Sequence, residues 1–384
     1  MADASSKPFY RDFRLGILGG GQLGRMLIQS CIDFNIQACV LDGDEHAPCR
    51  GVAHEFTLGK LTDADAVYAF GKDKDLVTIE IENVNVDALE RLEREGVTVR
   101  PTPAVIRVVQ DKRIQKRFYR DHGIPTADFV LTENREDTRK HADFLPAVHK
   151  LGREGYDGRG VRKLPDAAAL DEAFDAPGVL EKLIDFEKEI SIIVTRNDQD
   201  QVAVHPPIEM VMNPEFNLVE YLFAPANISA EVEAKAGEIA VRLARELKYI
   251  GVLAVEMFLT REGEVLVNEI APRPHNSGHH TIKANYTSQY EQHLRAILDL
   301  ELGSTRTKRT CAMINLLGEP DFSGPAIFEG IHEALGIEGV YIQLYGKKET
   351  RPFRKMGHIT ILDDNQAGLK EKVDRVRGLV KVKA

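Results

Sequence analysis

The chain has 384 residues, of which 43% are hydrophobic and 29% are charged. These values are typical of a globular protein with two or three domains. The formal net charge of −10 argues against nucleic-acid binding by the whole molecule, although it allows a local basic site for an anionic substrate. The first residues, MADASSKPFYRDF, do not form a signal peptide, and no apolar run approaches the ~18 residues that span a bilayer. We therefore expect a cytoplasmic protein that binds neither nucleic acid nor a membrane.

Residues 14 to about 110 alternate short strand-like runs with helical runs. Strands are expected at 14–19, 37–42, 54–59 and 76–81, and helices at 22–34, 63–72 and 87–96. This alternation predicts a small doubly wound domain with a parallel sheet and crossover helices.

The first strand leads into the stretch GILGGGQLGRML. Gly19, Gly21 and Gly24 have the spacing G-x-G-x-x-G, and Asp42 ends the second predicted strand. This pattern is typical of a dinucleotide-binding site, so it suggests an NAD-dependent oxidoreductase unless the rest of the chain indicates another function.

The middle of the chain predicts a smaller unit. Asp111 is a candidate N-cap of a helix that Gly123 and Pro125 end. Two strands follow, joined by the glycine-rich stretch GREGYDGRG, then a helix at 165–174 and strands at 178–184 and 187–195. The glycines would let backbone N–H groups approach a phosphate, with Lys150 as a point charge, although such a loop is more often only a turn.

A long amphipathic helix is expected from Ser229, with one apolar stripe. Its stripe consists of Val232, Ala236, Ile239, Leu243 and Leu247.

The hairpin VLAVEMFLTREGEVLVNEI follows this helix. A two-residue turn at Glu262 and Gly263 would place Glu256 opposite Glu269 on one face of the sheet. Ala254, Phe258 and Val267 would share that face, and Asn268 would point to the other one unless the strand twists or ends there. Two facing carboxylates suggest a bound Mg²⁺ ion, whereas the alternative is a solvent-facing edge with two unpaired glutamates.

The segment APRPHNSGHHT comes directly after this hairpin. Arg273, His275, Asn276 and Ser277 would lie near the paired acids, which is the chemistry that phosphoryl transfer needs. His279 and His280 could suggest zinc, but the glutamates favour a harder ion.

None of the four cysteines forms a C-x-x-C pair, so we expect buried, reduced thiols at Cys31, Cys39, Cys49 and Cys311.

The C-terminal stretch YGKKETRPFRKMGH is strongly basic. It is either an anion site or a solvated turn, and Pro352 with the apolar strands on both sides suggests that its tip is held in place. Its cations are Lys347, Lys348, Arg351, Arg354 and Lys355.

Five stretches, in this order, resemble the ATP-grasp superfamily: GILGGGQLGRM, VTIEIENV, GYDGRG, VNEIAPRPHNSGHHT and YGKKETRPFRKMGH. The resemblance is greatest to its ATP-dependent carboxylating enzymes of purine synthesis. It implies an α/β and α+β ATP-grasp fold with a Rossmann-like N-terminal domain (1–111), a small lid domain (112–190) and a C-terminal mixed-sheet domain (191–384). It also implies a homodimer, and carboxylation of the amine of 5-aminoimidazole ribonucleotide by bicarbonate and ATP through carboxyphosphate.

The resemblance further implies roles for single residues. ATP would contact Lys112, Lys150, Gly155, Tyr156, Asp157, Gly158, Arg159, Gly160, Val161, Glu181, Lys182, Leu183, Ile184, Glu189, Asn268 and Glu269. Mg²⁺ would bind Glu256 and Glu269, and the catalytic residues would be Arg273, His275, Asn276, Asp157 and Lys347. The ribonucleotide would contact Gln22, Leu23, Glu80, Tyr156, Asp157, Arg159, Lys347 and Arg354. The glycine fingerprint would then serve this phosphorylated substrate rather than NAD.

Three positions depart from the family's pattern. Lys112 stands where arginine is common, Met212 replaces a histidine that would touch the nucleotide, and Phe353 replaces a common glycine.

Three other functions stay open. They are another ATP-grasp ligase (a formate-dependent glycinamide ribonucleotide transformylase or a biotin carboxylase), an NAD-dependent oxidoreductase, and a nucleotide-binding regulator without turnover.

Overall fold

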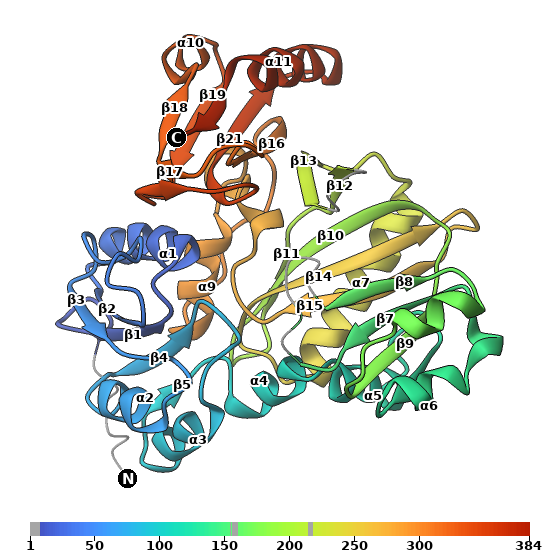
Figure 1. Ribbon diagram of the computed structural model, residues 1–384. Coiled ribbons are helices and arrows are strands. Elements are labelled where there is room, and N and C mark those ends of the chain that lie inside the picture. The colour runs from blue at the N-terminus through green and yellow to red at the C-terminus, as the bar shows by residue number, and fades with distance from the viewer. Residues whose placement is uncertain (1–7, 154, 156–159, 214–217) are drawn as a thin grey trace.

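The computed structural model describes residues 8–153, 155, 160–213 and 218–384. Its N-terminal part is a five-stranded sheet in the order β3-β2-β1-β4-β5, and each neighbouring pair is parallel (Figure 1). This confirms the predicted parallel sheet with crossover helices. The elements are β1 (Arg14–Leu18), α1 (Gln22–Asp33), β2 (Gln37–Asp42), β3 (Glu55–Leu58), α2 (Ala64–Gly71), β4 (Leu76–Ile79), α3 (Val86–Arg94), β5 (Thr98–Val99) and α4 (Pro103–Gln110).

Helix α5 (Lys112–Asp121) leads from this unit into a four-stranded antiparallel sheet of order β6-β9-β7-β8. As predicted, Asp111 caps α5, because its carboxylate accepts a hydrogen bond from the N–H of Arg113 at 2.9 Å. The helix expected at 165–174 is instead a short 3₁₀ helix. The elements are β6 (Phe129–Thr132), α6 (Arg135–Arg139), η1 (Ala142–Phe144), β7 (Ala147–Leu151), β8 (Val161–Leu164), η2 (Ala167–Glu172) and β9 (Gly178–Lys182).

The third sheet has nine strands in the order β15-β14-β10-β12-β13-β16-β21-β19, with β11 paired to β10. All its ladder pairs among the described residues are antiparallel, so the mixed C-terminal sheet that we expected is an antiparallel one. The strands are β10 (Phe186–Arg196), β11 (Val202–Val204), β12 (Ile208–Asn213), β13 (Leu218–Ala224), β14 (Gly251–Thr260), β15 (Val265–Ala271), β16 (Thr310–Leu317), β19 (Val340–Leu344) and β21 (Lys355–Asp363).

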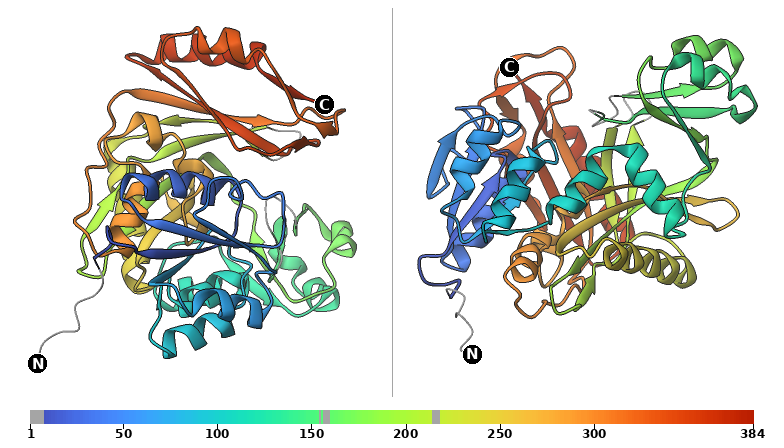
Figure 2. Two further views of the ribbon diagram at one scale, coloured as in Figure 1. Left: turned by 90° about the vertical axis from the view of Figure 1, so that its left-hand side faces the viewer. Right: turned by 90° about the horizontal axis from the view of Figure 1, so that it is seen from below.

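One face of β10, β14 and β15 packs against α7 (Ala230–Glu246). The predicted stripe of α7 is confirmed: Ala236, Ile239 and Leu243 are buried there with Ile192 and Val255 of the sheet. Because strand residues alternate between faces, the polar residues of these strands lie on the opposite face. The right-hand view of Figure 2 shows the five-stranded and four-stranded sheets on either side of the large sheet.

The C-terminal layer covers β16, β21 and β19. Helix α11 buries Leu369, Val373 and Val376 against this end of the sheet. The remaining elements are η3 (Asn276–Gly278), α8 (Thr281–Ala284), α9 (Gln289–Ile297), β17 (Gly324–Pro325), β18 (Ile327–Glu329), α10 (Ile331–Leu335), β20 (Glu349–Thr350), α11 (Gln366–Leu379) and β22 (Lys381–Lys383).

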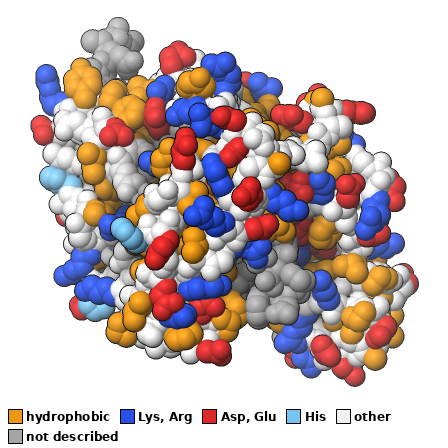
Figure 3. Space-filling model, turned by 90° about the horizontal axis from the view of Figure 1, so that it is seen from above, with side chains coloured by type: hydrophobic (Ala, Val, Ile, Leu, Met, Phe, Trp, Pro, Cys, Tyr) orange, Lys and Arg blue, Asp and Glu red, His pale blue; other side chains and the backbone are white. Residues whose placement is uncertain are grey.

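Acidic and basic side chains are interspersed on the face seen from above in Figure 3. Among the described helices, none is long and apolar enough to cross a membrane. The four cysteines are buried and unpaired, as predicted.

Candidate active site

The turn of the β14–β15 hairpin is longer than predicted. The N–H of Thr260 donates to the carbonyl of Glu264 at 2.9 Å, and the N–H of Gly263 donates to the carbonyl of Thr260 at 3.0 Å. The turn therefore contains three residues, 261–263, rather than two. Gly263 adopts a φ of 81°, which a glycine reaches without a steric cost.

A β-bulge on β15 compensates for this extra residue. Met257 pairs with Val267, whereas Glu256 pairs with Glu269, so Asn268 is inserted between the two pairs. The predicted pairing of Glu256 with Glu269 is therefore confirmed, although the predicted two-residue turn is wrong.

The bulge also changes which side chains share a face. Asn268 and Glu269 both reach lysines of the site: Lys150 Nζ donates to Asn268 Oδ1 at 2.8 Å, and Lys112 Nζ donates to Glu269 Oε2 at 2.8 Å. Val267 is instead buried in the core beneath α7. The predicted faces of Asn268 and Val267 are both wrong, because the extra residue reverses the alternation at this point of the strand.

The neighbouring strand β10 adds polar groups to the same face. Ser191 pairs with Glu256, and Glu189 pairs with Phe258, so these side chains lie beside the two acids. Phe258 stacks on Phe186 with ring centroids 4.8 Å apart. The face thus carries three carboxylates beside an aromatic wall.

The pKa values of the two facing acids are shifted in opposite directions. Burial, together with the neighbouring Glu269, raises the pKa of Glu256, whereas the ammonium of Lys112 lowers the pKa of Glu269. One carboxyl of the pair is therefore stabilised in its neutral form and the other in its charged form. A cation between them would remove this asymmetry.

The four-stranded sheet brings two lysines to one buried carboxylate. Lys150 on β7 lies 3.1 Å from Glu181 Oε1, and Lys116 on α5 lies 3.1 Å from Glu181 Oε2. Burial alone would raise the pKa of Glu181, but the two ammonium groups hold it below its usual range. Lys150 therefore joins the small sheet to the large one through Glu181 and Asn268.

The segment after β15 is fixed beside Glu256. His275 Nε2 lies 3.6 Å from Glu256 Oε1, and its Nδ1 lies 2.9 Å from Ser277 Oγ, which contacts Ser191 Oγ at 2.8 Å. Gln289 holds the backbone of His275, accepting from its N–H at 2.8 Å and donating to its carbonyl at 2.7 Å. The predicted proximity of His275 to the acids is therefore present.

Two further residues of this segment have partners on other elements. Arg273 Nε lies 2.9 Å from Glu82 Oε1, and Asn276 exchanges two side-chain hydrogen bonds with Asn315 of β16 at 2.8 and 3.2 Å. These contacts tie the segment to the loop after β4 and to β16 of the large sheet.

The adjacent histidine pair is buried in the protein core. His279 Nδ1 contacts the hydroxyl of Tyr290 at 3.0 Å, and His280 Nδ1 contacts the carbonyl of Ser277 at 3.0 Å. Within the described residues, no group of three or more His, Cys, Asp or Glu side chains is arranged to hold a metal ion. The geometry favours packing roles for His279 and His280 over zinc binding.

The glycine fingerprint surrounds a carboxylate. Glu80, at the end of β4, accepts a hydrogen bond from the N–H of Leu23 in the first turn of α1 at 3.1 Å. Burial raises the pKa of Glu80 to about 7, and Arg273 opposes this rise. Asp42 accepts from the N–H of Gly20 at 2.6 Å, so the acid that would bind a cofactor ribose caps the loop instead. A protein carboxylate thus already faces the helix N-terminus, which argues against a pyrophosphate there.

Gly21 gives a direct test of this packing. A Cβ atom at Gly21 would overlap with Glu80 Oε1, so the carboxylate would have to move away and lose its hydrogen bond from the N–H of Leu23. We therefore expect Gly21→Ala to destabilise the protein by about 0.5–1.5 kcal/mol. Urea denaturation measures the change. Gly51→Ala is the matched control, because its Cβ would meet no atom within 4 Å. Equal stability of the two variants would contradict the assigned position of Glu80.

The basic tip is held in place, as predicted. Phe353 N–H donates to Gly318 O at 2.8 Å, and Gly318 N–H donates to Arg354 O at 3.0 Å. Lys347 Nζ donates to the carbonyl of Lys355 at 2.7 Å. Phe353 has a φ of 61°, a left-handed conformation that explains why glycine suits this position.

Several predicted site residues have no described contacts. Tyr156, Asp157, Gly158 and Arg159 lie outside the described residues, and so do the side-chain surroundings of Met212. Lys150 pairs with Val161 in the β7–β8 ladder, so the glycine stretch joins two strands as predicted, with Gly155 and Gly160 in the connection. Lys182 ends β9, Leu183 and Ile184 lie in the connection to β10, and Gln22 begins α1.

Four residues of the site, Lys116, Glu82, Ser191 and Asn315, were not predicted from the sequence. Lys116 could have been found, because it lies one helical turn after Lys112 and so shares its face of α5. Glu82, Ser191 and Asn315 gave no such signal, since their partners are distant in the chain.

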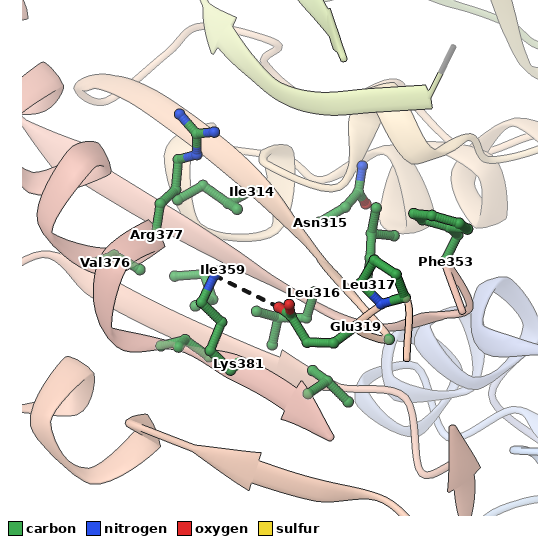
Figure 4. A pocket seen from close by; sticks show the side chains of 14 residues that line it. Ile314, Asn315, Leu316, Leu317, Glu319, Phe353, Ile359, Val376, Arg377 and Lys381 are labelled. Carbon is green, nitrogen blue, oxygen red and sulfur yellow. Dashed lines mark ion pairs between the residues drawn. The ribbon is translucent and has the colours of Figure 1, made fainter. Parts of the chain in front are cut away.

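A separate cavity of about 310 Å³ lies between α11 and the C-terminal strands (Figure 4). Aliphatic side chains, including Leu316, Ile359 and Val376, line most of it, and Lys381 lies 3.6 Å from Glu319 at one side. Its lining contains none of the acids or lysines described above, so we place the active site at the β14–β15 hairpin instead.

The three sheets, with Lys112 of α5 and Lys150 of the small sheet directed at the acid-bearing hairpin of the large one, define an ATP-grasp protein. Family models match three segments: a ribonucleotide synthetase preATP-grasp domain (13–110), an ATP-grasp domain (117–290) and a phosphoribosylaminoimidazole carboxylase C-terminal domain (311–372). The chain belongs to the N5-carboxyaminoimidazole ribonucleotide synthase family.

Similar proteins cover almost the whole chain. The synthase of Bacillus subtilis is 34% identical, with 93% of each chain covered. The crystal structure of the synthetase from Thermotoga maritima is 37% identical with a TM-score of 0.89, covering 97% of this chain and 99% of that one. A structure from Aspergillus clavatus, in complex with ADP and 5-aminoimidazole ribonucleotide, is 32% identical with a TM-score of 0.87 and covers 96% and 98%. The chain spans about two thirds of the plant and fission-yeast carboxylases that it matches, 66% and 65%.

Proposed function

We propose that this chain catalyses the ATP- and bicarbonate-dependent carboxylation of 5-aminoimidazole ribonucleotide to N5-carboxyaminoimidazole ribonucleotide, with release of ADP and phosphate. The observation that carries this proposal is the face on which Glu256 and Glu269 pair opposite Lys112 and Lys150. Bicarbonate would attack the γ-phosphate to give carboxyphosphate, which breaks down to phosphate and CO₂. The amine of the ribonucleotide would then capture the CO₂ as a carbamate.

The nucleotide would lie between the two sheets. Lys150 Nζ lies 3.1 Å from Glu181 Oε1 but donates its hydrogen bond to Oε2, so the buried Oε1 accepts none from the described residues. This supports a role for Oε1 in accepting from an adenine amino group. Glu189 would accept from the ribose, and burial already raises the pKa of this carboxyl. Lys112 and Lys150 would bind phosphates, with backbone groups of the 155–161 loop and of the 182–184 passage completing the site.

The paired acids fit a divalent cation. They are hard oxygen donors on one sheet face, and burial followed by repulsion from Glu269 raises the pKa of Glu256. Glu256 and Glu269 would hold Mg²⁺, with Asn268 beside them. When bound, Mg²⁺ neutralises charge on the phosphate oxygens.

The segment after β15 would hold the second reactant. His275 is kept in place by Gln289 and Ser277, and Arg273 is oriented by Glu82, so both can be set in position before the reactants bind. Arg273, His275 and Asn276 would bind bicarbonate and then carboxyphosphate. Fixing both reactants can contribute about 7–11 kcal/mol to lowering the barrier.

The ribonucleotide would lie between the basic tip and α1. Lys347 and Arg354 would attract its phosphate, whereas Glu80 beside Gln22 and Leu23 suits hydroxyl groups. We therefore move the predicted phosphate contact away from the N-terminus of α1. Tyr156, Asp157 and Arg159 remain predicted contacts, with Asp157 facing the amine.

The decisive test is a coupled assay of ADP release. We expect release only when ATP, Mg²⁺, bicarbonate and 5-aminoimidazole ribonucleotide are all present, with labelled bicarbonate entering an acid-labile product. Formate plus glycinamide ribonucleotide should give none. Release with that pair, or a change in nicotinamide fluorescence when NADH is titrated with the protein, would refute the proposal.

Three further points rest on the family resemblance alone. We propose that the chain is a homodimer, that it acts in the cytoplasm, and that its domains divide near residues 111 and 190.

A further inference from the structure

Lys116 is a buried cation that the mechanism above does not use. Its side chain is 2% exposed, and its ammonium contacts Glu181 Oε2 at 3.1 Å and Thr126 Oγ1 at 2.6 Å. The Thr126 hydroxyl in turn donates to the carbonyl of Val267 at 2.6 Å. Lys116 is therefore anchored to both sheets through contacts that involve no exposed group.

Lys150 has a different environment, although it shares the same carboxylate. Its ammonium contacts Glu181 and the side chain of Asn268, and its side chain is 11% exposed. Asn268 lies on the bulge next to Glu269, at the end of the site where phosphates would bind. Of the two lysines that contact Glu181, Lys150 is thus the one that an incoming phosphate would attract.

Moving Lys150 toward a phosphate would cost free energy if Lys150 were the only cation beside Glu181. A buried carboxylate that loses its only cation is strongly destabilised, so such a carboxylate would compete with the phosphates for the lysine. Lys150 donates to Glu181 Oε2 at 3.2 Å, the same oxygen that Lys116 contacts, so Glu181 stays paired through Lys116 after Lys150 leaves.

We propose that Lys116 is a positioning residue, the permanent counter-ion of Glu181 that frees Lys150 to bind the nucleotide phosphates. This inference rests on the proposed ATP site. It assigns the two lysines different tasks: Lys116 neutralises the protein carboxylate, and Lys150 neutralises the ligand.

The test compares the affinity for ATP with that for adenosine, which lacks phosphates. In Lys116→Met, Glu181 retains Lys150, so we expect the ratio of ATP to adenosine affinity to fall at least tenfold. In the double variant Lys116→Met/Glu181→Gln, the carboxylate is gone and the ratio should return to within about threefold of wild type. Isothermal titration calorimetry measures both dissociation constants without turnover.

Lys74→Met is the matched control, because Lys74 is also a buried, ion-paired lysine but lies in the N-terminal sheet unit beside Asp73. This variant should leave the ratio of ATP to adenosine affinity unchanged.

If Lys116→Met alone fails to fold, the same ratio is compared between the double variant and Glu181→Gln. Similar ratios support the inference. A lower ratio in the double variant shows that Lys116 acts on the phosphates directly, which overturns it. A Lys116→Met ratio equal to wild type also overturns it, whereas a wild-type protein that binds no ATP refutes the proposed function instead.

Discussion

Glu269→Gln is expected to abolish ADP formation, with a loss of at least about 100-fold, while the fold stays intact. The amide keeps the size of the side chain but removes the charge that pairs with Lys112 and that would hold Mg²⁺. The Glu269 side chain is 44% exposed, so losing this ion pair should change the free energy of unfolding by less than about 1 kcal/mol. Steady-state ADP release and urea denaturation measure the two effects separately.

Glu262→Gln is the control for this substitution. Glu262 lies in the exposed turn of the same hairpin, so its amide variant should retain full activity. A weakened metal site also predicts that the residual activity of Glu269→Gln needs more Mg²⁺ for half-saturation. Wild-type turnover in Glu269→Gln would contradict the assignment of the paired acids.

The second large effect is loss of stability in mild acid. Six histidines are buried in the neutral form, and burial lowers the pKa of each below its ordinary value of 6.5. They are His149, His205, His279, His280, His293 and His358. The unfolded chain therefore binds protons below pH 6.5 that the folded protein does not bind, and stability falls as pH falls toward about 4.

The size of this effect follows from the number of protons. Each histidine contributes a slope of up to about 1.4 kcal/mol per pH unit. Glu80, Glu189 and Glu256 act in the opposite direction, because their raised pKa values let them bind protons in the folded state. Near pH 5.5 we expect a net slope of roughly 4 kcal/mol per pH unit, a large part of the ~5–15 kcal/mol typical of a folded protein.

Urea denaturation between pH 7.5 and 5 measures this slope directly. His293→Gln should reduce the slope by the contribution of about one proton. The neutral His293 ring uses both nitrogens: Nε2 contacts Thr78 Oγ1, and Nδ1 accepts from the N–H of Val252. His46→Gln should leave it unchanged, since His46 is 63% exposed. A stability that does not change over this range would contradict the buried neutral state of these histidines.

The sequence predicted those features of the site that depend on neighbouring residues. The predicted pairing of Glu256 with Glu269 holds because the bulge at Asn268 offsets the extra residue of the turn. Helix spacing from Lys112 would have been enough to find Lys116. The parallel N-terminal sheet and the apolar stripe of α7 followed from periodicity in the same way.

Features that depend on distant segments could not be predicted. The bulge at Asn268 coincides with an outside contact, since Val267 N–H donates to Pro125 O at 2.8 Å and its carbonyl accepts from Thr126. The carboxylate of Glu80 at the glycine loop likewise comes from a strand 57 residues after Leu23. The spacing of the glycines indicates where the backbone leaves space, but it does not indicate which group fills that space.

Glu80 also limits what the N-terminal domain can be engineered to do. A designer who wished to convert this domain into a nicotinamide-coenzyme module would find the correct glycines already present, yet its own acidic side chain would repel the coenzyme's diphosphate bridge. Replacing that acid would have to precede any redesign of the surrounding loops.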